Sequence, residues 1–100
     1  MHCVYKITFT DREEKGIYPC YYIGSKSNCV LKEGGTLHQI KKDGKVIKTP
    51  YWGSSQYRGY KDIVKTEEKV MEVIKWFSEH DECLMYEKYL HEENDVVINT

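Results

Sequence analysis

The sequence predicts a small α/β domain, of the α+β kind, in which a central antiparallel β-sheet is flanked by helices. Apolar residues alternate along residues 2–9, which is the period of a half-buried strand. Residues 38–48 place β-branched side chains on both sides of Asp43-Gly44, the dipeptide typical of a two-residue hairpin turn. Residues 78–93 instead begin with a capping signal and continue with helical apolar spacing. Hairpins and helices together in one short chain predict this class.

Length and composition limit the chain to one modest core. One hundred residues is the size of a single small domain, so we expect one domain over residues 1–100. Forty per cent of the residues are apolar, which is typical of a folded domain and not of a disordered segment. No run of about eighteen apolar residues and no signal-peptide pattern occur. We therefore expect no membrane span and a cytoplasmic location.

The four cysteines are scattered along the chain without Cys-x-x-Cys spacing. This argues against a zinc site and against a dense disulfide framework, and it predicts reduced thiols. A thiolate and histidine metal site stays a less favoured alternative, because none of these residues has the spacing of zinc ligands. The cysteines are Cys3, Cys20, Cys29 and Cys83.

The N-terminal half predicts two hairpins. Residues 2–9 and 18–24 read as neighbouring antiparallel strands, and the polar run at 10–16 reads as the loop between them. Residues 25–36 contain two adjacent glycines and little periodicity, which predicts a loop. The second hairpin is an insertion over about 38–48, with a type I′ turn at Asp43-Gly44.

The C-terminal half predicts a helix, a strand and a second helix. Ser54 or Ser55 would cap a short helix in which Tyr57, Tyr60 and Val64 recur at helical spacing. Residues 68–77 suit a helix by spacing and a strand by their Val, Ile, Trp and Phe content, and we predict a strand. Ser78 would cap a last helix to about Glu93, whose buried stripe would contain Cys83, Leu84 and Leu90.

Charge is divided unevenly although the formal net charge is only −1. Residues 26–65 carry nine basic and three acidic side chains, a net charge of +6, and residues 66–100 carry three basic and ten acidic ones, a net charge of −7. One side facing phosphate would produce this asymmetry, because non-specific nucleic-acid binding depends on Lys and Arg. Solvated charged faces would produce it equally well.

Four side chains have residue types and positions that suit chemistry. Glu87 falls three or four residues from apolar positions of the last helix, so its carboxylate needs a partner or a cation, unless it only covers the rim of the core. Arg58 lies at the start of the first helix, where a guanidinium suits a phosphate, unless it is a solvated surface arginine. Tyr5 and Tyr22 lie on neighbouring strands and face each other, which ordinary packing also explains.

The order of these residues and their motifs resembles the GIY-YIG nuclease family. The similarity is strongest to the compact phage-borne homing endonucleases, which have counterparts of "YKIT" (5–8), "YYIGSKS" (21–27), "YWGSS" (51–55) and "YEKYLHEENDVV" (86–97). In that family the first tripeptide lies within the first strand, so its counterpart here is "CVY", Cys3 to Tyr5. The literal "GIY" at 16–18 does not fit, because only three residues separate Tyr18 from Tyr22.

The resemblance implies a metal-dependent endonuclease that cuts double-stranded DNA. Tyr5 and Tyr22 would orient or deprotonate the attacking water, Arg58 would stabilise the transition state, and Glu87 would bind Mg²⁺ or another divalent cation. His38 and Asn99 are expected to support the site. The DNA would approach the basic middle segment, at Lys26, Lys41, Lys42, Lys45, Lys48 and Lys61.

Departures from the family pattern keep other functions open. Cys3 replaces the glycine of the first tripeptide, and Asp62 stands where many relatives have a histidine or tyrosine. The alternative is a catalytically inactive module of the same fold that binds nucleic acid through its lysines. A third reading is a structural or partner-binding domain.

Overall fold

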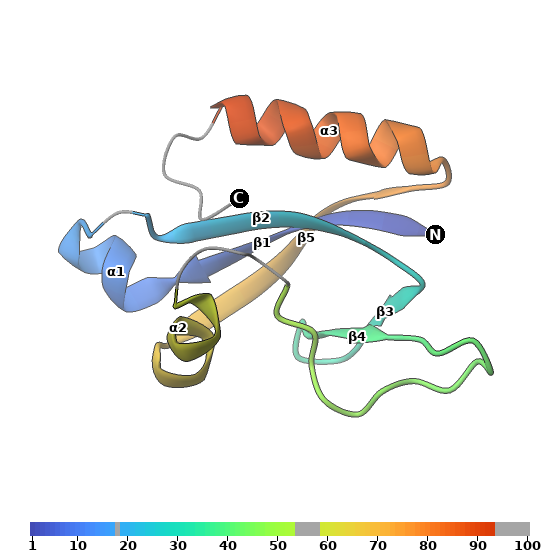
Figure 1. The fold of residues 1–100 in the computed structure, drawn as a ribbon, viewed down its shortest axis with the longest axis horizontal. Helices are drawn as coiled ribbons and strands as arrows, with labels where there is room; N and C mark the ends of the chain where they lie inside the picture. Colours follow the sequence, from blue (N-terminus) through green and yellow to red (C-terminus); the bar gives the residue numbers. More distant parts are fainter. Residues whose placement is uncertain (18, 54–58, 94–100) are drawn as a thin grey trace.

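The computed structural model describes residues 1–17, 19–53 and 59–93. Within these ranges a three-stranded antiparallel sheet forms the centre, in the order β2-β1-β5, and helices lie on both of its faces (Figure 1). The predicted α+β class is thus confirmed. The strands are β1 (His2–Phe9), β2 (Tyr21–Ser27) and β5 (Lys69–Phe77).

β1 is the central strand and is covered on both faces. Its residues pair with β2 on one side and with β5 on the other, so that Tyr5 lies opposite Gly24 and opposite Val73. The pairing with β5 shifts between Val4 and Tyr5, which indicates a bulge. Cys3, Tyr5, Ile7 and Phe9 enter one hydrophobic cluster and Val4 enters the other, as the period of two predicts.

One face of the sheet packs against α3 (His80–Glu93), and the other face carries the larger core. Val4, Ile23 and Cys83 form the cluster beneath α3. The opposite cluster lies beneath α2 (Tyr60–Thr66) and a small ribbon made of β3 (Cys29–Leu31) and β4 (Leu37–Gln39) (Figure 1). Its buried members are Cys3, Tyr5, Ile7, Phe9, Tyr22, Cys29, Leu37, Tyr60 and Ile63.

The expected loop at 10–16 is wrong, because Thr10–Lys15 form the short helix α1. Gly16 ends this helix in the left-handed conformation, with φ 70°. The Gly16 amide donates to the Glu13 carbonyl and the Ile17 amide to the Arg12 carbonyl, which is the Schellman pattern. Charged residues that read as a loop are good helix formers once such a cap and a tertiary anchor are present.

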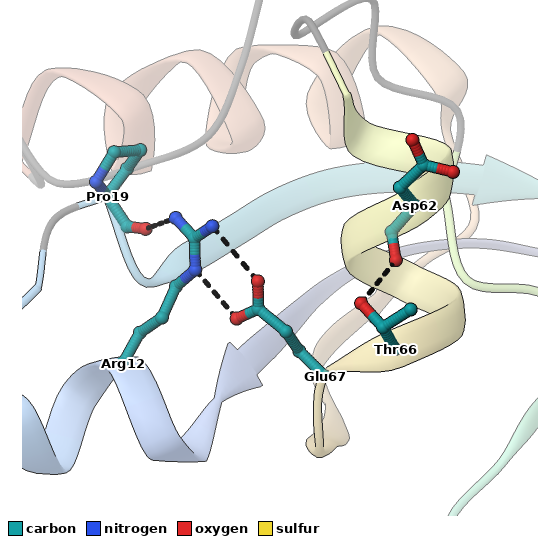
Figure 2. A network of polar contacts seen from close by, with 5 residues as sticks. All are labelled: Arg12, Pro19, Asp62, Thr66 and Glu67. Atoms are coloured by element: carbon teal, nitrogen blue, oxygen red, sulfur yellow. Dashed lines mark hydrogen bonds and ion pairs between the residues drawn. The ribbon is translucent and has the colours of Figure 1, made fainter.

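Arg12 supplies that anchor (Figure 2). Its Nε and terminal nitrogen donate to the two carboxylate oxygens of Glu67 at 2.7 and 3.0 Å, and its other terminal nitrogen donates to the Pro19 carbonyl at 3.2 Å. The paired charges are about three-quarters buried, with 20 and 26 % of the side chains exposed. A two-pronged contact of this kind ties α1 to the turn between α2 and β5 and to the chain before β2.

The second strand runs later than predicted. β2 begins at Tyr21 and continues past Gly24 to Ser27, so the expected end at Gly24 and the loop over 25–36 are wrong. Gly24 pairs with Tyr5 in the middle of β1, which leaves three earlier residues of β1 without a partner if β2 ended there: His2, Cys3 and Val4. Those residues find their partners in positions 25–27 of β2. Tyr18, where the strand was expected to start, lies outside the described residues.

The inserted hairpin is present but short, and its turn differs from the prediction. Ile40 and Val46 form an isolated bridge, and the Lys41 amide donates to the Lys45 carbonyl. Gly44 has φ 86°, whereas Asp43 is not among the described residues with positive φ. A type I′ turn needs positive φ at both positions. The loop therefore has three central residues and places only the glycine in the left-handed region.

The C-terminal elements follow the prediction more closely. The strand at 68–77 is confirmed as β5, and α3 ends at Glu93. α2 begins only at Tyr60, and the proposed caps Ser54 and Ser55, like Tyr57, lie outside the described residues. Leu84 is 42 % exposed, so it does not belong to the buried stripe of α3, which instead contains Cys83, Tyr86 and Leu90.

Two further expectations concern the chain as a whole. All four cysteines are free thiols, as predicted. Among the described residues, no helix combines the length and apolar character needed to cross a membrane.

Candidate functional site

Tyr5 and Tyr22 meet on the face of the sheet opposite α3, as their strand positions predict. Their ring centroids are 5.9 Å apart. Tyr51 packs edge-on against Tyr5 with a centroid distance of 6.0 Å, and Tyr60 packs against Tyr22 at 5.2 Å. We call Tyr5, Tyr22, Tyr51 and Tyr60 the tyrosine cluster. It gathers residues from β1, β2, α2 and the segment before α2 into one aromatic group.

Two glycines make room for this cluster. A Cβ atom at Gly24 would lie 2.6 Å from Tyr5 Oη and 2.8 Å from Tyr22 Cε1. A Cβ atom at Gly53 would lie 2.7 Å from Tyr22 Cε1, and the φ of 85° at this residue disfavours a side chain in any case. The glycine of "YIG" is therefore needed because the two tyrosine rings occupy the space beside its backbone.

The Tyr5 hydroxyl is fully buried and has no hydrogen-bond partner among the described residues. Burial raises the pKa of the Tyr5 phenol well above its usual value, and the neighbouring Tyr22 and Tyr51 raise it further. The hydroxyl consequently stays protonated at neutral pH. Such a group suits hydrogen-bond donation better than it suits a general base. Tyr22 and Tyr51 are thus the side chains that surround this hydroxyl.

Glu87 projects from α3 toward the residue that follows Gly24. The Ser25 hydroxyl donates to Glu87 Oε1 at 2.9 Å, and His91 Nε2 lies 3.8 Å from Glu87 Oε2. The same His91 nitrogen is 2.7 Å from the Ile23 carbonyl, to which it donates. Ser25 pairs with Val4, whose side chain lies in the cluster beneath α3. Glu87 and the tyrosines thus approach neighbouring residues of β2 from opposite faces of the sheet.

The carboxylate of Glu87 fits a divalent cation in a limited way. About 22 % of its side chain is exposed, and a carboxylate oxygen is a hard ligand of the kind that Mg²⁺ prefers. Among the described residues no group of three or more His, Cys, Asp or Glu side chains converges. A single carboxylate is still compatible with Mg²⁺, which commonly keeps several waters and takes its other ligands from a substrate phosphate.

The predicted DNA-binding lysines lie on the side of the sheet that carries the tyrosine cluster, or on the loop beyond β4. Lys26 Nζ sits 4.9 Å from the centroid of the Tyr51 ring, which brings a positive charge next to the cluster. The lysines of the hairpin loop and of α2 are exposed; these are Lys41, Lys42, Lys45, Lys48 and Lys61.

The expected supporting residues do not join the tyrosine cluster. His38 is 6 % exposed and uses both ring nitrogens within the insertion: Nδ1 donates to the Ile47 carbonyl at 2.9 Å, and Nε2 accepts from the Thr36 hydroxyl at 3.0 Å. Its described contacts therefore brace the β3–β4 ribbon. Arg58 and Asn99 lie outside the described residues.

Three residues near the candidate site were not predicted: Ser25, Tyr51 and His91. Ser25 and His91 contact Glu87, and Tyr51 contacts Tyr5. Ser25 and Tyr51 belong to the motifs "YYIGSKS" and "YWGSS". Their places in these motifs could have identified them as residues near the site. His91 follows Glu87 by one helical turn, a spacing that brings side chains together on a helix face.

Comparison with known proteins gives one similarity. No protein-family model matches the chain, and no solved structure matches it significantly. The chain is similar to an uncharacterized 24.6 kDa protein from the Gp32-Gp59 intergenic region of Enterobacteria phage T4, with 29 % identity over 94 residues. The match covers 94 % of this chain and 41 % of the phage protein, so the chain spans about two fifths of that relative's length.

The partnerless hydroxyl of Tyr5 leads to a stability prediction. Tyr5→Phe removes a buried polar atom without breaking a described hydrogen bond, so the free energy of unfolding should change by less than about 0.5 kcal/mol or should rise. Tyr60→Phe is the matched control, because its hydroxyl donates to the Trp52 carbonyl at 2.6 Å. That change should cost about 1 kcal/mol. Urea denaturation of both variants measures the difference, and a larger loss for Tyr5→Phe would contradict it.

Proposed function

We propose that this chain is a metal-dependent endonuclease of the GIY-YIG type that hydrolyses phosphodiester bonds in double-stranded DNA. The observation that carries the proposal is the convergence at Gly24 and Ser25 of β2. Tyr5 and Tyr22 pack over Gly24 on one face, and Glu87 bonds to Ser25 on the other. These are the residues to which the family resemblance assigns chemistry.

β2 is an edge strand of the sheet, which lets a substrate approach both groups. A phosphate at the β2 edge would lie near the tyrosine face and near the carboxylate of Glu87 together. Lys26 of the same strand carries its ammonium to the tyrosine side. The insertion that carries further lysines also lies on the side of the sheet away from α3 (Figure 1), whereas α3 contributes acidic side chains on the opposite side. The charge distribution thus favours approach of DNA from the tyrosine face.

Hydrolysis requires water to attack phosphorus while a P–O ester bond breaks and the leaving oxygen gains a proton. The Tyr5 hydroxyl is protonated but fully buried, so it would donate a hydrogen bond to the attacking water or to a phosphate oxygen only if substrate binding opens the tyrosine cluster. The carboxylate of Glu87 would hold Mg²⁺, with Ser25 fixing the orientation of one of its oxygens. A bound divalent ion supplies Lewis-acid stabilisation of the charge that develops on the phosphate. Arg58 keeps the transition-state role that the resemblance implies.

The alternative function is a catalytically inactive module that binds nucleic acid with the same lysines. The burial of the Tyr5 hydroxyl and the hydrogen bond from Ser25 to Glu87 are compatible with purely structural roles. Such a module would bind DNA in the presence of divalent cations, but it would not cut the DNA whichever cation is added. With either function, the protein would act on DNA in the cytoplasm. If the chain is encoded by a phage, this is the cytoplasm of the host cell.

Cleavage of supercoiled plasmid tests the proposal. The wild-type protein should nick or linearise the plasmid with Mg²⁺ and leave it intact with a chelator. Glu87→Gln keeps the shape of the side chain but removes its charge, so cleavage should fall at least about a hundredfold. Glu82→Gln is the matched control, because Glu82 is an exposed glutamate of the same helix. This variant should cleave the plasmid at the wild-type rate. Equal cleavage by the Glu87 and Glu82 variants would contradict the assignment of Glu87.

The DNA-binding surface has its own test. Replacing the hairpin lysines Lys41, Lys42, Lys45 and Lys48 by glutamine should weaken binding of a short duplex. It should also flatten the dependence of log K on log salt, by up to about 0.9 per lost phosphate contact. The control replaces Lys15 of α1 and Lys88 of α3, exposed lysines outside the proposed surface. If the slope of log K against log salt changes only in the control variant, the hairpin lysines do not contact the DNA.

A further inference from the structure

Cys3 and Cys29 form a thiol pair that the proposed nuclease chemistry does not use. Cys3 lies near the start of β1 and Cys29 begins β3. Both side chains are buried, both are free, and their sulfur atoms are 3.8 Å apart. A disulfide needs a separation of about 2.0 Å, so a small movement of the two side chains would bring the sulfurs to bonding distance.

Cys29 is the better nucleophile of the pair. Hydrogen bonding with Cys3 and the nearby ammonium of Lys26 lower the pKa of Cys29 below its usual value, against the opposing effect of burial. The same hydrogen bond raises the pKa of Cys3, and burial raises the pKa of Cys20 and of Cys83. The thiolate is the reactive form of cysteine. Cys29 should therefore react first among the four thiols.

A surface hollow gives a small reagent a route to Cys29. The hollow has a volume of about 400 Å³ and lies where β3 meets the beginning of β1 and the end of β5. It is lined by Met1, Cys29, Val30, Leu31 and Trp76. Cys3 is fully buried and does not line the hollow, so a small oxidant entering the hollow would reach Cys29 before it reached Cys3.

We propose that Cys29 and Cys3 are a peroxide-reactive pair, in which Cys29 is the attacking thiol and Cys3 the resolving thiol. The Cys29 thiolate attacks one oxygen of hydrogen peroxide, the O–O bond breaks, and the released hydroxide takes a proton to become water. The resulting sulfenic acid is then attacked by the Cys3 sulfur, its S–O bond breaks, and a second water leaves. Two thiols are oxidised to one disulfide while one peroxide is reduced to two waters.

The disulfide would join the first strand of the sheet to the β3–β4 ribbon. Cys3 pairs with Lys26 in β2, and the Cys29 thiol contacts the Lys26 carbonyl, so both sulfurs already border the same residue. Cys83 is the competing partner, because its charge affects the pKa of Cys3. Its side chain belongs to the cluster beneath α3, however, and the pair of Cys3 and Cys29 belongs to the opposite one. This proposal does not depend on the nuclease function.

The test treats the reduced, folded protein with hydrogen peroxide and follows free thiols, intact mass and non-reduced peptide maps. Two of the four thiols should disappear, the mass should fall by two hydrogen atoms, and the linked peptides should contain Cys3 and Cys29. Cys3→Ala should instead gain one oxygen atom at Cys29, trapped by dimedone. Cys29→Ala should lose thiols at least about tenfold more slowly than the wild type.

Two controls keep the test decisive. Cys20→Ala should form the same disulfide at the wild-type rate. Protein denatured in guanidinium before oxidation should give a mixture of pairings, which shows that the native fold selects the pair. Retention of all four thiols by the folded wild type, a link from Cys29 to Cys83, or a link between two chains would each overturn the proposal. The wild-type peptide map decides the question even if the Cys3 variant fails to fold.

Discussion

The close contact of Tyr5 with the backbone of Gly24 is the constraint on which the rest of the structure depends. β1 is paired on both sides, and its side chains on the face away from α3 are fully buried, so Tyr5 has little freedom to move. Tyr5 Oη lies where a side chain at Gly24 would begin, and Tyr22 crowds the same position. The register of β1 against β2 is therefore set by packing as well as by hydrogen bonds. A shift of one residue would move Tyr5 to the face covered by α3.

The sheet also separates the parts of the candidate site. The tyrosines lie with the basic insertion on one face, and Glu87 lies with acidic α3 on the other. Among the described residues, β2 at the edge carries both Gly24, which borders the tyrosines, and Ser25, which bonds to Glu87. This arrangement explains why Ser25 matters as much as Gly24: it ties the carboxylate of a distant helix to the strand that carries Tyr22. A nuclease built this way would bring its substrate to the strand edge and not to a cleft between helices.

Elements with a clear period could be predicted from the sequence. Residues 2–9 alternate, and β1 has the same bounds. Residues 69–77 contain the β-branched and aromatic side chains that strands favour. α1 could not be predicted by periodicity, because "TDREEK" has no apolar face and depends on Gly16 and on the Arg12–Glu67 contact. Leu84 was wrongly predicted to be buried beside Cys83. Consecutive residues of a helix differ in direction by about 100°, so Leu84 is exposed where Cys83 is buried.

The candidate site was predictable to a similar extent. The contact between Tyr5 and Tyr22 could be predicted because the two residues lie on neighbouring strands. The alternation of apolar residues along these strands indicates which side chains share a face. The Ser25–Glu87 hydrogen bond joins residues 62 positions apart and depends on how α3 is rotated over the sheet. No local pattern encodes that rotation. The hydrogen bonds of His38 to Thr36 and Ile47 likewise could not be predicted from sequence position, because they depend on how the chain folds around β4.

The most direct measurement compares single-turnover DNA cleavage by Tyr5→Phe and Tyr18→Phe, with thermal melts to exclude misfolding. Gly16 of the literal "GIY" ends α1, whereas Tyr5 of "CVY" packs against Tyr22. We expect Tyr5→Phe to cleave about a hundredfold more slowly, on the scale of a lost proton-transfer or hydrogen-bonding group, and Tyr18→Phe to cleave almost normally. Loss of cleavage in Tyr18→Phe with full activity in Tyr5→Phe would contradict this expectation.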